Sequence, residues 1–134
     1  MKAVFKLWLD QEGKAFGDGP FELLKRIEAT GSLHKAAAQM EMAYSKAWKL
    51  LRMIEQRLGF RVLEREVGGH SGGGSRITPR AKELMSSFLI FREEVQEAVN
   101  RIFQNRFRSF KEARPIGERQ AHKTKKLKVG RYNE

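Results

Sequence analysis

The sequence predicts a mostly α-helical fold with small β elements, a winged helix-turn-helix that has an N-terminal β-hairpin and a long C-terminal helix. Three observations support this prediction. A tight turn near residues 41–42 joins two helical segments. Two strand-forming segments then flank a glycine-rich stretch, and a long heptad pattern follows them. We divide the chain into a winged helix-turn-helix domain (1–78), a long helix (79–108) and a basic, disordered tail (109–134).

The charge of the chain favours a polyanionic partner. The 134 residues include 27 Lys and Arg against 16 Asp and Glu, a net charge of +11. Lys and Arg displace counterions from phosphates, so nucleic acid is the expected partner. The absence of cysteine excludes disulfides and thiolate metal sites. We find neither a spanning apolar run nor a signal peptide and expect a soluble, cytoplasmic protein.

The N-terminal residues predict a β-hairpin followed by a helix. Segments 4–9 and 14–16 are rich in strand-forming residues and are separated by a turn over 10–13. Pro20 is suited to the first position of a helix, where its missing N–H costs nothing. Gly31 is expected to end this helix.

The next two helices are predicted to form the helix-turn-helix itself. Ser32 is a typical N-cap for a short helix over 33–40. A third helix is predicted over 43–58, because its apolar residues fall on one helical stripe, and it is expected to end at Gly59. These residues are Ala47, Leu51, Ile54 and Leu58.

A wing is predicted after the third helix. Strands are expected within 60–67 and over 76–78, around the glycine-rich loop, and Thr78 with Pro79 is a typical helix start. Glycines in the loop would allow the backbone to approach a sugar-phosphate chain closely. A P-loop is excluded because no Lys-Ser or Lys-Thr pair follows the glycines. A hairpin tip without a ligand remains the alternative.

The long C-terminal helix carries an apolar heptad stripe. Its members step by 4, 3, 4, 3 and 4 residues, which is typical of a coiled-coil seam. The stripe therefore predicts a homodimer, with packing along the helix's own domain as the alternative. Beyond it, residues 111–134 hold eight Lys and Arg against three Glu and show no apolar period, which predicts the disordered tail. The seam residues are Leu84, Phe88, Phe91, Val95, Ala98 and Ile102.

A second face of the third helix has the composition of a DNA-recognition surface. Arg and Lys donate hydrogen bonds to guanine or phosphate, and Tyr and Ser bind phosphate oxygens. An ordinary solvated cationic face is the alternative, and the sequence leaves open whether Trp48 belongs to this face or to the core. The candidate DNA-binding residues are Ser32, Tyr44, Ser45, Lys46, Trp48, Lys49 and Arg52, with Arg65, His70 and Arg76 in the wing.

No catalytic or metal site is predicted. His34, His70 and His122 lie far apart in the sequence and lack the spacing of a metal motif such as HExxH. No acidic residues accompany a credible nucleophile. We therefore predict a protein that is not an enzyme and needs no cofactor.

Six segments in order resemble a known family. They lie in 16–19, 23–27, 30–33, 36–37, 42–48 and 68–79, and the most specific are Tyr44-Ser-Lys-Ala-Trp48 and the glycine-rich wing. Together they resemble the N-terminal domain of the molybdate-responsive transcriptional regulators of the ModE type, over about residues 1–105. The resemblance implies a winged helix-turn-helix of LysR-like form that binds double-stranded DNA and dimerises through its long helix.

The sequence also departs from that family. Glu41, Ala43 and Ser45 replace the usual Gly, Ser and Arg, which removes a helix cap and a cation. His70 and Ser71 replace a basic residue and Gly in the wing. Family members carry C-terminal molybdate-binding domains, whereas here a basic tail without strand patterning follows the helix. The resemblance therefore implies DNA binding, and no molybdate site is expected in this chain.

The function predicted from these observations is that of a homodimeric, sequence-specific transcriptional regulator. Helix 43–58 would enter the major groove, and the wing would contact the backbone. One alternative is a non-specific architectural protein that binds nucleic acid mainly through its tail, which deletion of 111–134 would reveal. The other is a dimeric protein-interaction module that has lost DNA binding, which a gel shift with its own upstream region would reveal.

Overall fold

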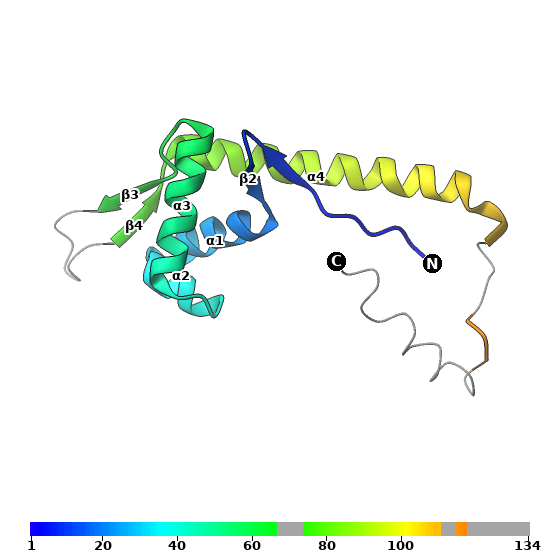
Figure 1. The fold of residues 1–134 in the computed structure, drawn as a ribbon, viewed down its shortest axis with the longest axis horizontal. Coiled ribbons are helices and arrows are strands. Elements are labelled where there is room, and N and C mark those ends of the chain that lie inside the picture. The colour runs from blue at the N-terminus through cyan, green and yellow to red at the C-terminus, as the bar shows by residue number, and fades with distance from the viewer. Residues whose placement is uncertain (67–73, 111–114, 118–134) are drawn as a thin grey trace. The chain divides into compact units, whose positions relative to one another are not determined.

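The structure, a computed structural model, describes residues 1–66, 74–110 and 115–117 (Figure 1). It confirms the predicted winged helix-turn-helix fold class. The chain divides into two compact units, residues 5–95 and residues 1–4 with those beyond 95. Within the described residues the elements follow in this order: β1 (Trp8–Asp10), β2 (Lys14–Gly17), α1 (Asp18–Thr30), α2 (Leu33–Gln39), α3 (Tyr44–Leu58), β3 (Leu63–Glu66), β4 (Gly74–Ile77), α4 (Pro79–Arg106) and the 3-10 helix η1 (Arg108–Phe110).

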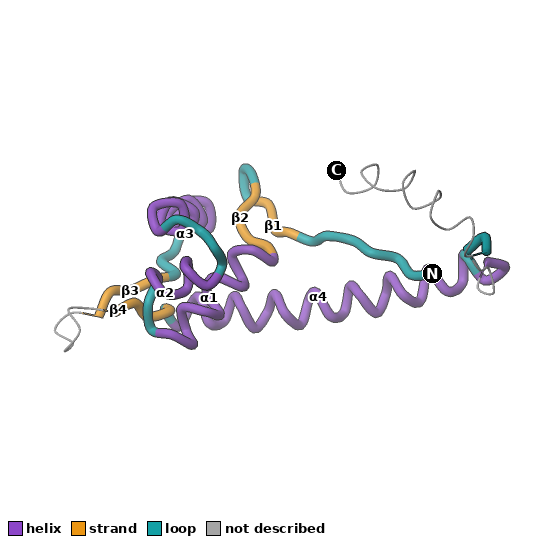
Figure 2. Tube along the Cα trace, turned by 90° about the horizontal axis from the view of Figure 1, so that it is seen from below, coloured by secondary structure: helices purple, strands orange, loops and turns teal. Residues whose placement is uncertain are grey.

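The predicted N-terminal hairpin is present as the antiparallel pair of β1 and β2, seen side by side in Figure 2. Leu9 pairs with Phe16, and a bulge follows at Asp10. The Asp10 carboxylate accepts a hydrogen bond from the Gly13 N–H at 3.2 Å, which closes the turn. Phe16 is buried, so the hairpin contributes one large side chain to the core.

Helix α1 begins at Asp18, so Pro20 is its third residue and not its first as predicted. Proline is tolerated there because the N–H groups of the first turn have no partner within the helix. The predicted end is confirmed. Gly31 adopts a left-handed φ of 72° and donates its N–H to the Ile27 carbonyl at 2.7 Å.

The turn between α2 and α3 has Schellman geometry. The Met42 N–H reaches the Ala37 carbonyl at 2.9 Å, and the Glu41 N–H reaches the Ala38 carbonyl at 3.0 Å. Glu41 therefore holds a left-handed φ of 54°, a conformation that favours glycine. The turn then leads to Ala43, the N-cap of α3, which makes no side-chain cap hydrogen bond. The expected loss of the helix cap is confirmed.

Replacing Glu41 with glycine is expected to raise the free energy of unfolding by about 1 kcal/mol, because it removes the cost of a left-handed conformation in a residue with a Cβ. Urea unfolding of the two proteins measures the difference. Ala38, an exposed helical residue of α2, offers the control, since Ala38→Gly should lower the free energy of unfolding by about 0.5–1 kcal/mol. If both variants lost the same free energy of unfolding, the left-handed conformation of Glu41 would not carry the expected cost.

The core of the 5–95 unit lies where α1, α2, α3 and the first part of α4 meet the hairpin. Ala36 and Ala37 are fully buried on α2, and their small side chains permit close approach of α1 and α3. The largest fully buried side chains come from five different segments and so connect the whole unit. They are Phe16, Leu23, Leu24, Ile27, Ile54, Val62 and Phe88.

The wing strands β3 and β4 pair antiparallel, with Leu63 opposite Ile77 and Arg65 opposite Ser75. β3 is shorter than the predicted segment 60–67, because pairing begins only at Leu63. β4 is offset from the predicted 76–78, because it begins at Gly74 and ends at Ile77. The connecting loop with His70 lies outside the described residues. The predicted Thr78 cap is confirmed, since its Oγ1 accepts a hydrogen bond from the Ala81 N–H at 3.0 Å.

Helix α4 is 28 residues long and runs through both units. Within the 5–95 unit it buries Ala81, Met85 and Phe88. In the other unit, Phe103 stacks on Phe107 with ring centroids 5.0 Å apart, just before η1 begins at Arg108. Among the described residues, no helix combines the length and apolar character that membrane crossing requires. Apart from 115–117, the predicted tail beyond residue 110 is outside the described residues.

Candidate nucleic-acid interface

Helix α3 separates into a buried face and an exposed face, as its sequence pattern predicted. The buried face carries Ala47, Leu51, Ile54 and also Glu55. The exposed face holds every α3 residue that the sequence singled out for DNA contact. Trp48 belongs to it, with 41% of its surface exposed, so the structure decides the question that the sequence left open. The exposed candidates are Tyr44, Ser45, Lys46, Trp48, Lys49 and Arg52.

Aromatic contacts order both ends of this exposed face. The Arg52 guanidinium lies over the Trp48 ring, 5.0 Å from its centroid. Near the helix N-terminus, the Tyr44 ring lies 5.4 Å from the ring of His34 on α2. A cation held against an aromatic ring has fewer conformations to lose on binding. The face is therefore partly preorganised for an anionic ligand.

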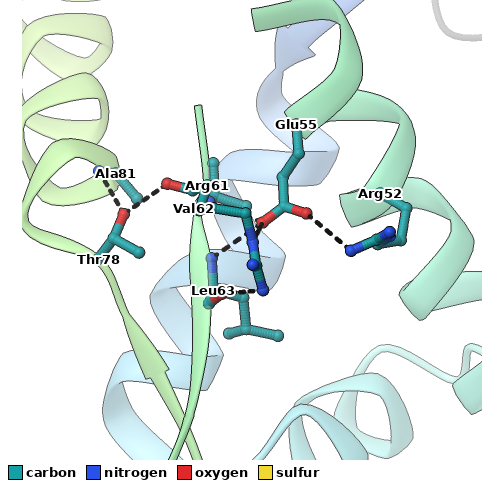
Figure 3. Close-up of polar contacts among 7 residues, drawn as sticks. All are labelled: Arg52, Glu55, Arg61, Val62, Leu63, Thr78 and Ala81. Carbon is teal, nitrogen blue, oxygen red and sulfur yellow. Dashed lines mark hydrogen bonds and ion pairs between the residues drawn. The ribbon is translucent and has the colours of Figure 1, made fainter. Parts of the chain in front are cut away.

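Glu55 connects α3 to the first wing strand (Figure 3). Its side chain is only 9% exposed. One carboxylate oxygen, Oε2, accepts hydrogen bonds from the Val62 N–H at 2.9 Å and from Arg61 Nε at 3.2 Å. The other oxygen, Oε1, faces Arg52 Nη1 at 3.8 Å. Hydrogen bonds and cations satisfy this buried carboxylate, which fixes the start of β3 relative to α3.

Two further contacts attach the base of the wing. The Thr78 hydroxyl donates to the Arg61 carbonyl at 2.7 Å, as Figure 3 shows. On β4, the Ser75 N–H donates to the Gly31 carbonyl at 2.8 Å, directly beside the start of α2. The wing strands, α3 and the start of α2 therefore form one connected surface.

The remaining predicted contact residues lie around this surface. Ser32 is the N-cap of α2, and its hydroxyl oxygen accepts the Lys35 N–H at 3.1 Å. Arg65 is exposed on β3. Arg76 is exposed on β4 and pairs with Glu64 at 3.6 Å. The structure brings these residues into the same unit as the α3 face, while His70 is outside the described part.

Glu55 and Arg61 are not among the site residues predicted from the sequence. A signal was present for Glu55, because it lies four residues after Leu51 on the apolar stripe of α3 and is a charge where burial is expected. Arg61 has no such pattern. Its position is fixed only by the turn after Gly59, which returns the chain to the side of α3.

The predicted seam residues of α4 differ in exposure. Phe88 is 1% exposed and packs against Phe16 and Phe21 of its own unit, so it has almost no surface to offer a second copy. Leu84 is half-buried against the same core. Phe91 and Ile102 are exposed, and Val95 and Ala98 are half-buried.

Residues 20–82 match the family described as bacterial regulatory helix-turn-helix protein, lysR family. The chain is 39% identical over 66 residues to the molybdenum transport protein ModE of Herbaspirillum seropedicae, covering 49% of this chain and 24% of that protein. It is 34% identical over 83 residues to the transcriptional regulator ModE of Haemophilus influenzae (62% and 32%). It is 29% identical over 99 residues to the DNA-binding transcriptional dual regulator ModE of Escherichia coli (73% and 38%).

The matched region is the region that contains the site. Residues 20–82 include most of α1, all of α2 and α3, and both wing strands, and they contain the exposed cationic face and the Glu55 contacts. The chain spans between 24% and 38% of the length of these three relatives. Residues 20–82 therefore match the lysR family of bacterial regulatory helix-turn-helix proteins, and the N-terminal part of this chain is similar to part of each of these ModE proteins.

Proposed function

We propose that this protein is a transcriptional regulator that binds double-stranded DNA with α3 in the major groove and the β3–β4 wing on the flanking backbone. The observation that carries the proposal is the exposed face of α3. It presents Lys46, Lys49 and Arg52 beside two exposed aromatic residues, while its apolar stripe is buried in the core. This division matches what a recognition helix needs, a fixed inner face and an outer face of hydrogen-bond donors.

We further propose that two copies associate through α4. Exposed apolar side chains continue along this helix, including Ile90 and Phe91 in one unit and Ile102 in the other. A second copy would cover the stripe by coiled-coil packing. Two recognition helices would then read half-sites one turn of DNA apart or a multiple of it. A regulator acting on chromosomal DNA would work in the cytoplasm.

The test is binding to duplexes selected by the protein from random DNA, measured by fluorescence anisotropy over a range of salt concentrations. With roughly 6–10 phosphates neutralised, affinity should fall by about 10³–10⁵ between about 50 and 200 mM salt. Lys49→Ala should weaken binding and, if Lys49 contacts a phosphate, lower the salt slope by about one. A salt-independent affinity would contradict the electrostatic basis of the proposal.

Lys25 provides the matched control, because it is an equally charged, exposed lysine on α1. Lys25→Ala removes the same charge and should leave the footprint of the protein on its selected duplex unchanged. Identical behaviour of the Lys25 and Lys49 variants would show that charge alone, and not the α3 face, determines binding.

A further inference from the structure

A small hollow lies between the recognition helix and the first wing strand. Its volume is about 210 Å³, and Trp48 and Leu63 are among its walls. Three arginines line it, Arg52 from α3, Arg61 from the connecting turn and Arg65 from β3. Glu55 is the one acidic residue among the lining residues. The hollow is therefore a cationic site on the same surface as the exposed face of α3.

The Arg61 guanidinium is held in a fixed orientation although its side chain is 68% exposed. Its Nε donates to Glu55 Oε2 at 3.2 Å, and its Nη2 donates to the Leu63 carbonyl at 3.3 Å. A guanidinium has five N–H donors, so these two bonds leave donors available to a ligand. Figure 3 shows the same carboxylate lying between Arg61 and Arg52.

The other two arginines complete the site. Arg52 is positioned by the Trp48 ring and by Glu55. Arg65 has no hydrogen-bond or ion-pair partner within the described ranges of the chain. Three arginines and a single carboxylate, which pairs with Arg52 and Arg61, leave an excess of positive charge around the hollow. Such a site favours a compact anion with several oxygens, which arginine binds in bidentate fashion.

We infer that this hollow binds one phosphate of the DNA backbone, with Arg61 as its central ligand and Glu55 as the positioning residue that aims Arg61 and Arg52 at it. The inference rests on the proposed DNA-binding function and names a contact within it. A phosphate held between the recognition helix and the wing fixes the depth and angle of the helix in the groove. It would contribute affinity and register without reading bases.

The first experiment compares Arg61→Ala with Arg80→Ala on a duplex that the wild-type protein selects. Arg80 is the matched control, because it is similarly exposed, at 64%, and pairs with Glu83 outside the hollow. Arg61→Ala is expected to weaken binding about tenfold and to lower the salt slope by about one, with unchanged base preference. Arg80→Ala should change affinity far less. Equal effects of the two variants would overturn the inference.

The second experiment identifies the phosphate directly. Methylphosphonate linkages, which lack the negative charge, replace single phosphates of the duplex in turn. At one position in each half-site the substitution should weaken the wild-type protein about tenfold and leave the Arg61→Ala protein unaffected, because the same contact is already lost. The inference would be overturned if, at every phosphate, the loss of affinity from the linkage simply added to the loss from Arg61→Ala. It would also be overturned if millimolar inorganic phosphate competed with DNA while no single linkage had a position-specific effect.

Folding and function are separated by two checks. Arg61→Lys keeps the charge but not the planar fork, so it should retain the fold and recover only part of the lost affinity. Thermal unfolding of each variant verifies that the domain is intact. If the wild-type protein binds no duplex at low salt, the proposed function fails. If it binds and Arg61→Lys behaves as wild type at every linkage, only the assignment of a bidentate arginine site fails.

Discussion

Phe88→Ala is expected to lower the free energy of unfolding by about 3–5 kcal/mol, the range for truncating a large aromatic side chain in a packed core. Phe88 is fully buried on α4, and its ring meets that of Phe16 edge-on at 5.2 Å. The Phe21 ring lies 5.9 Å away, and the Arg92 guanidinium lies over both Phe21 and Phe88. Truncation therefore leaves a cavity where α4, the hairpin and α1 meet. Chemical denaturation followed by circular dichroism measures the loss.

The matched variant is Phe91→Ala, one turn further along α4, where the ring is 44% exposed. Its effect on the isolated domain should be below about 1 kcal/mol, because little surface is buried there. If α4 forms the proposed dimer seam, Phe91→Ala should instead weaken self-association, seen by sedimentation over a range of concentrations. A Phe88→Ala effect that grew with protein concentration would place Phe88 in the dimer seam and contradict its intradomain role.

Glu55→Ala is expected to cost about 2–3 kcal/mol of folding free energy, because it leaves the buried Val62 N–H without an acceptor and removes the shared partner of two arginines. The arginines themselves are largely exposed and regain water, so most of the cost comes from the backbone donor. Because Leu63 N–H also points at this carboxylate, at 3.4 Å, the start of β3 should loosen. Amide hydrogen exchange at Val62 and Leu63 should become faster than in the wild-type protein.

Glu64 is the control for this prediction, since it is an acidic wing residue in an exposed pair with Arg76. Glu64→Ala should change the free energy of unfolding by at most about 0.5–1 kcal/mol, as is usual for a surface ion pair. Similar losses in the two variants would mean that Glu55 contributes only through its charge. Faster exchange confined to the Glu55 variant would support its role in attaching the wing.

Local rules explain why so much of the fold was predictable from the sequence. The Ser32 cap, the Thr78 cap and the Gly31 and Gly59 helix ends depend on neighbours within a few residues, and the structure contains all four. The exposed face of α3 was also predictable, because a stripe of apolar residues determines which side of a helix is buried. The predicted start of α1 at Pro20 differs from the observed start at Asp18, because proline is acceptable anywhere in a first turn.

The sequence by itself determined the helix-turn-helix, the wing strands and the position of the cationic face, since each follows from short-range pattern and charge. Only the tertiary structure decided what the apolar and buried residues touch. An a/d stripe looks the same whether it faces its own core or another copy, and packing against Phe16 and Phe21 assigned Phe88 to the core. The pairing of Glu55 with Arg61 likewise depends on the turn that folds β3 back against α3, because a buried charge is stable only where the fold supplies its partners.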